Sequence, residues 1–163
     1  SEKRYSISQP TKTLLKKANA PLEVSIYLDG DLNPGFTRLK NSTKNLLDEM
    51  SVYAAEGIDM EFINPSTAAT QAEREQKYLE LEAEGMTPTA IYERDKEGKS
   101  IQKIVFPWVK MTYGNKTVVV NLLKNIRGLQ GEENLNISIE NLEFEITDGN
   151  RSERRVRRRT LDP

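Results

Sequence analysis

The 163-residue chain contains no cysteine and no histidine. Without cysteine it cannot form disulfides, carry out thiol redox chemistry or build a thiolate metal site. Without histidine it lacks the commonest general base and the commonest protein ligand of transition metals. The usual hydrolase triads and zinc sites are therefore excluded, whereas catalysis by carboxylates, lysine or tyrosine stays open.

Charge is unevenly distributed along the chain, although the net charge of the whole chain is only −1. Residues 151–163 hold six arginines beside Glu153 and Asp162, so this segment carries +4 and residues 1–150 carry −5. An acidic body is a poor surface for nucleic acid. The arginine run would suit anionic lipid or nucleic acid, but blocks of like charge repel and rarely fold. We therefore expect residues 148–163 to be an engineered or disordered tail.

Removing residues 151–163 is expected to leave the free energy of unfolding unchanged within about 0.5 kcal/mol. The segment offers only Val156 and Leu161 as apolar side chains. Such a surface is too small to offset roughly 1–2 kcal/mol of backbone entropy for each ordered residue. Thermal melts of the whole chain and of residues 1–150 test this expectation. A fall of many degrees on truncation would show that the tail is an integral part of the domain.

Long apolar runs are absent as well. No stretch approaches the roughly 20 apolar residues needed to span a bilayer, and the sequence has no signal peptide. The sequence starts at Ser1 rather than at a methionine, so we expect a fragment processed or engineered from a longer protein. A membrane anchor elsewhere in that protein stays open.

Strand and helix patterns alternate along the chain. Apolar residues alternate with polar ones through 22–28, as expected of a strand. Phe36, Leu39, Leu46 and Met50 recur at the spacing of a helix. The predicted helices are 8–18, 36–56 and 68–84, the last with an apolar stripe of Ala72, Leu79 and Ala83. The predicted strands are 22–28, 59–63, 89–93, 101–112 and 117–122. Residues 134–147 fit a strand or a helix; the helix is favoured.

These elements predict one α/β domain over residues 1–147. Helices join the first three strands, which should therefore be parallel, and the hairpins that follow add antiparallel strands. The result is a thioredoxin-like mixed sheet of about five strands flanked by helices. Pro88 enters the third strand where such folds carry a cis-proline, and both a cis and a trans bond stay open there. Pro107 predicts a bulge or local edge in the long strand, and its neighbours Phe106 and Trp108 are expected in the core.

Several short motifs mark the predicted domain. In chain order they are RYSIS at 4–8 with Thr11 and Leu14-Leu15, VSIYLDGDL at 24–32, Phe36, Leu39 and LDEM at 47–50, INP at 63–65, GMTPT at 85–89 and NISIENLEF at 136–144. Together they resemble GldG-type proteins, the auxiliary components of ABC transporters associated with gliding motility. The arginine-rich end departs from the pattern of that family.

The resemblance implies a location and partners. It implies a parent protein on the periplasmic side of the inner membrane, anchored by a membrane helix just before residue 4 and by another at its C-terminus. It also implies association with an ABC permease and an ATPase. No cofactor, metal or nucleic-acid partner is expected.

The candidate binding residues follow two predicted strands. Asp29, Asp31 and Asn33 lie after the first strand, at the carboxyl end where α/β folds tend to bind ligands. The spacing echoes a calcium loop, but Pro34 stands where glycine is required and Lys40 where glutamate is required. A structural alternative is that these side chains satisfy the donors of the next helix. Thr87 and Pro88 are candidates for contact with a bound peptide, with a structural turn as the alternative.

Three functions remain open at this stage. We favour a non-catalytic extracytoplasmic domain of an ABC-transporter auxiliary component that binds a protein partner or a transported ligand. The main alternative is a sugar- or peptide-binding sensor domain of an unrelated cell-envelope complex. A carboxylate-based enzyme comes third, because the many acidic residues fall in no recognisable acid–base motif. Neighbouring genes for an ATPase and a permease would favour the first, and a hydrolase cluster would favour the others.

Overall fold

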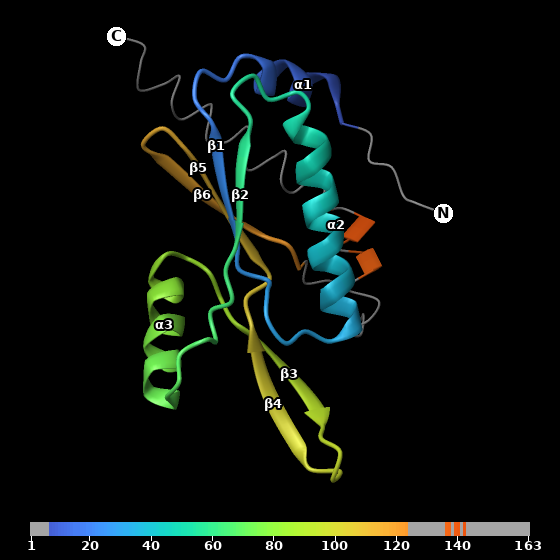
Figure 1. Ribbon diagram of the computed structural model, residues 1–163, viewed down its shortest axis with the longest axis vertical. Helices are drawn as coiled ribbons and strands as arrows, with labels where there is room; N and C mark the ends of the chain where they lie inside the picture. The colour runs from blue at the N-terminus through green and yellow to red at the C-terminus, as the bar shows by residue number, and fades with distance from the viewer. Residues whose placement is uncertain (1–6, 124–135, 138, 141, 143–163) are drawn as a thin grey trace.

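A computed structural model of the chain describes residues 7–123, 136–137, 139–140 and 142 (Figure 1). Helices and strands alternate through its first half, and strands follow one another in the second. The helices are α1 (Gln9–Lys16), α2 (Pro34–Ser51) and α3 (Gln71–Ala83). The strands are β1 (Leu22–Ile26), β2 (Ile58–Phe62), β3 (Thr89–Arg94), β4 (Ser100–Val105), β5 (Trp108–Tyr113) and β6 (Lys116–Asn121).

A four-stranded mixed sheet in the order β2-β1-β5-β6 forms the centre of the fold. β1 is parallel to β2 and antiparallel to β5, and β6 is antiparallel to β5. The helix between β1 and β2 makes them a βαβ unit, to which a hairpin adds two antiparallel strands. The predicted α/β class and mixed sheet flanked by helices are therefore confirmed.

The helix α2 covers one face of this sheet and supplies much of the core. Its apolar residues repeat at helical spacing, so they lie on one side of the helix. Phe36, Leu39, Leu46, Leu47 and Met50 are all buried against Val24 and Ile26 of β1 and Val109 and Met111 of β5. Asn33 caps the start of the helix, and its side-chain oxygen accepts a hydrogen bond from the Phe36 N–H at 2.8 Å. The sequence pattern predicted this packing correctly.

The helix α3 lies on the opposite face, over the lower part of the sheet in Figure 1, and has a second, smaller core. Side chains alternate between the two faces of a strand, so Tyr27 points to α3 while Ile26 and Leu28 point to α2. Tyr27, Leu81, Met86 and Phe106 form this second buried cluster. The predicted stripe of Ala72, Leu79 and Ala83 is wrong, because all three are exposed and Leu81 is the buried residue.

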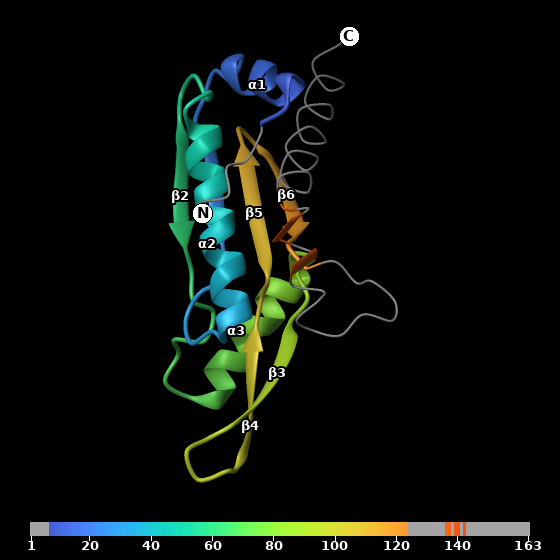
Figure 2. The same ribbon diagram turned by 90° about the vertical axis from the view of Figure 1, so that its right-hand side faces the viewer.

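Strand β3 does not belong to the central sheet. It pairs antiparallel with β4 in a separate two-stranded sheet, which continues below the four strands in Figure 2. The expected parallel third strand and the single five-stranded sheet are therefore wrong. The reason is a break at Phe106 and Pro107, which divides the predicted strand 101–112 into β4 and β5. Proline lacks the N–H needed to continue a ladder, and the irregularity predicted at Pro107 as a bulge or local edge is a full break between two strands.

No peptide bond in the described part of the chain is cis, so the bond before Pro88 is trans. The five described residues between 136 and 142 are helical, which confirms the helical alternative at those positions. The rest of the predicted helix 134–147 and the tail 148–163 lie outside the described residues. None of the helices in the described ranges is long and apolar enough to cross a membrane.

Candidate functional site

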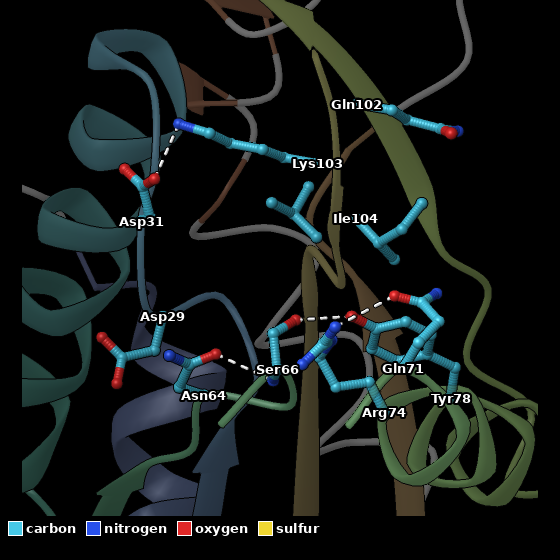
Figure 3. A pocket seen from close by; sticks show the side chains of 11 residues that line it. Asp29, Asp31, Asn64, Ser66, Gln71, Arg74, Tyr78, Gln102, Lys103 and Ile104 are labelled. Carbon is cyan, nitrogen blue, oxygen red and sulfur yellow. Dashed lines mark hydrogen bonds and ion pairs between the residues drawn. The ribbon is translucent and has the colours of Figure 1, made fainter. Parts of the chain in front are cut away.

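A polar hollow of about 530 Å³ lies where the carboxyl ends of β1 and β2 meet (Figure 3). Two parallel neighbours end at the same edge of a sheet, so the loops that follow them are brought together. Asp29 and Asp31 line the hollow from the loop after β1, and Asn64 and Ser66 line it from the loop after β2. The N-terminal half of α3 and the strand β4 complete the walls.

A chain of hydrogen bonds holds one wall together. The Asn64 side-chain oxygen accepts from the Ser66 N–H at 2.9 Å, and the Ser66 hydroxyl lies 2.7 Å from the Tyr78 hydroxyl of α3. The Tyr78 ring in turn packs against Phe106, with 5.5 Å between the ring centroids. The loop after β2 is thus fixed to α3, and α3 is fixed to the second core.

The two acidic side chains each form an ion pair with a lysine. Asp29 forms an ion pair with Lys40 of α2. Asp31 forms one with Lys103 of β4 at 2.7 Å, and Lys103 also reaches Glu93 of β3 at 2.8 Å. Hydrogen bonds to Asp31 and Glu93 raise the pKa of the Lys103 ammonium above its usual value. The loop after β1 is therefore tied to the β3–β4 hairpin.

Arg74 of α3 is the basic counterpart on the other side of the hollow. Its guanidinium donates to the carbonyl oxygens of Ala68 at 2.8 Å and Ala69 at 3.2 Å, and to the Gln71 side chain at 3.0 Å. These partners orient the group but are neutral. Within the described ranges no carboxylate forms an ion pair with Arg74, so its positive charge is uncompensated at the hollow.

The structure places two of the predicted binding residues at the hollow and the other three outside it. Asp29 and Asp31 line the hollow. Asn33 instead caps α2, which is the structural alternative considered for it. Thr87 and Pro88 are exposed in the loop before β3 and do not line the hollow. The Thr87 carbonyl oxygen accepts a hydrogen bond from the Trp108 indole at 2.8 Å.

The remaining side chains of the hollow were not predicted as site residues. Asn64 and Ser66 follow β2. The tendency of α/β folds to bind ligands at the carboxyl ends of parallel strands, which indicated Asp29 and Asp31, would therefore have indicated these two residues as well. Arg74 and Tyr78 lie on a helix whose buried side was predicted wrongly. Lys103 reaches the hollow because of the break before Pro107, and its side chain is tied to Asp31. Among the described residues, no group of three or more carboxylates could hold a metal ion.

Replacing Gly30 by alanine is expected to destabilise the domain and to disturb the wall at Asn64. Gly30 has φ +104°, a region that costs other residues about 1–2 kcal/mol. An added Cβ would also lie 2.6 Å from the Asn64 side-chain nitrogen. Gly98→Ala is the matched control, because Gly98 has φ +82° but an added Cβ would meet nothing within 4 Å. Urea unfolding should show a larger loss for Gly30→Ala; equal losses would contradict a tight contact with Asn64.

Comparison with known proteins yields one family. Searches against curated proteins and against solved structures gave no significant match. Residues 1–112 match the family described as "Domain of unknown function (DUF7088)". This match covers more than half of the chain and includes α1 to β4, most of β5 and all the residues that line the hollow. The chain therefore belongs to the DUF7088 domain family.

Proposed function

We propose that this domain is a non-catalytic, ligand-binding extracytoplasmic domain of an ABC-transporter auxiliary component of the GldG type. The observation that carries the binding function is the polar hollow at the carboxyl ends of β1 and β2. Open α/β sheets commonly bind ligands at this end. Polar groups from two loops, a helix and a strand converge there, as expected of a binding site. The transporter context rests on the motifs between residues 4 and 144.

The state of the carboxylates supports binding rather than catalysis. A general acid or base needs free access to the proton that it transfers. Asp29 and Asp31 are instead held in ion pairs with Lys40 and Lys103. These residues are therefore suited to fixing the shape and polarity of a binding site.

The transporter assignment is tested on the full-length parent protein. Tagged in its own organism and solubilised in mild detergent, the parent is expected to co-purify with a multi-spanning permease and an ATPase. Its neighbouring genes should encode the same two subunits. Purification of the parent without either subunit, beside a gene cluster of hydrolases, would contradict the assignment.

The purified 163-residue chain is expected to show no turnover of ATP, peptides or glycans. Its sequence has no thiol or imidazole nucleophile, and Gly98-Lys99-Ser100 does not complete a phosphate loop, because Glu93 stands where that motif requires its first glycine. Product formation is followed over hours at high protein concentration. Turnover that Asp29→Asn or Asp31→Asn abolishes would overturn the non-catalytic assignment.

A further inference from the structure

One edge of strand β4 faces the hollow, and no other described strand pairs with it. Within the ranges that the structure describes, β4 pairs with β3 alone, in the two-stranded sheet. Four consecutive residues of the strand, Gln102 to Val105, line the hollow. Successive side chains of a strand point to opposite faces, so a cavity that touches four in a row must run along the edge of the strand. The hollow therefore borders main-chain groups as well as side chains.

The hairpin register identifies which main-chain groups face outward. The Asp95 N–H donates to the Lys99 carbonyl at 2.8 Å, which makes this pair a hydrogen-bonded one. Hydrogen-bonded and non-bonded pairs alternate along an antiparallel ladder. The pairs Tyr92–Gln102 and Ala90–Ile104 are then non-bonded, so the N–H and C=O groups of Gln102 and Ile104 point away from β3. An unpaired edge of this kind is a template for another strand.

The charged side chains that line the hollow indicate which class of ligand it would bind. The carboxylates of Asp29 and Asp31 already pair with Lys40 and Lys103, whereas the Arg74 guanidinium has no carboxylate partner in the described part of the chain. Arginine binds carboxylates through well-directed, charge-assisted hydrogen bonds. A ligand that carries a carboxylate would compensate the charge of Arg74 without competing for the existing ion pairs.

We propose that the hollow binds an extended, acidic polypeptide segment, which adds as a strand along the free edge of β4. Its main chain pairs with the outward N–H and C=O groups of Gln102 and Ile104, and its carboxylate meets Arg74. Strand addition takes affinity from main-chain hydrogen bonds and specificity from side-chain contacts. Four residues of a strand span roughly 13 Å, so a short segment matches the stretch of β4 that borders the hollow. This inference rests on the proposed binding function.

The test uses the whole 163-residue chain, labelled with ¹⁵N, and two libraries of amidated pentapeptides. One library has glutamate fixed at the centre and the other has lysine, with all other positions randomised. The glutamate library is expected to shift the amide signals of Gln102 and Ile104, to slow their exchange with solvent, and to bind about tenfold more tightly than the lysine library. Equal binding of the two libraries, or shifts confined to another surface, overturns the proposal.

Matched variants separate the main-chain and charge contributions. Gln102→Pro removes an outward N–H from the hollow edge of the hairpin, and Tyr92→Pro removes the corresponding N–H from its opposite edge. Gln102→Pro is expected to weaken binding of the glutamate library about tenfold, while Tyr92→Pro leaves it unchanged. Arg74→Gln should remove the preference for glutamate. Arg94→Gln changes an exposed arginine of the β3–β4 hairpin and should retain that preference. Equal effects within either pair overturn the proposal.

A third titration of the labelled chain uses maltotriose and chitotriose as sugar probes. Shifts at Gln102 and Ile104 with these sugars, and none with the peptide libraries, overturn the peptide assignment while leaving a binding site in place. Failure of the transporter proposal is separate. It appears as absence of the permease and ATPase from the purified parent, whatever the peptide libraries do.

Discussion

Replacing Leu46 by alanine is expected to lower the free energy of unfolding by about 2–5 kcal/mol. Leu46 lies in the C-terminal half of α2 and is fully buried, with 0% of its surface exposed. It belongs to the large core that joins α2 to the four-stranded sheet. Truncation removes apolar contacts and leaves a cavity, because the surrounding side chains relax only in part. Urea unfolding followed by circular dichroism measures the change.

The matched control is Leu79→Ala on α3. It makes the same chemical change in a helix, but 59% of the Leu79 surface is exposed. Its effect should stay within about 0.5 kcal/mol, as for most surface substitutions. A loss below 1 kcal/mol for Leu46→Ala, or a similar loss for both variants, would contradict the packing of α2.

The two helices show when a sequence pattern predicts packing. In α2, Phe36, Leu39, Leu46 and Met50 give a continuous apolar stripe, so the buried side follows from spacing alone. In α3, a single residue, Leu81, is fully buried, and the half-buried Tyr78 completes the contact with Phe106. So few apolar residues do not show which side of α3 is buried, because its alanines are compatible with either burial or exposure. The position of α3 is decided by tertiary contacts that spacing does not encode.

The strand errors have a related cause. The pattern of residues 101–112 predicts one strand because residues on both sides of Pro107 are apolar. Proline marked the break correctly, but the pattern did not indicate that β4 would leave the sheet and pair with β3 alone. Four of the eleven residues that line the hollow depend on that departure. Asp29 and Asp31 could be predicted as site residues from their place after β1, whereas Gln102 and Lys103 required the three-dimensional arrangement.

Phe106 connects the fold to the hollow, and Phe106→Ala is expected to cost about 3–5 kcal/mol of unfolding free energy. The side chain is fully buried with Tyr27, Leu81 and Met86. Phe106→Leu keeps most of the apolar volume and should cost less, about 1.5 kcal/mol or below. A loss under 1 kcal/mol for Phe106→Ala would contradict the second core.

Phe106→Ala should also loosen α3 more than α2. Tyr78 packs on Phe106 and hydrogen-bonds Ser66, so loss of the ring loosens the α3 wall of the hollow while the α2 core is left intact. Amide hydrogen exchange is therefore expected to accelerate in α3 far more than in α2. Binding of the glutamate peptide library should weaken in the same variant, because Arg74 is carried by α3. Uniform acceleration across both helices would mean that the two cores unfold as one unit and that Phe106 does not specifically support the site.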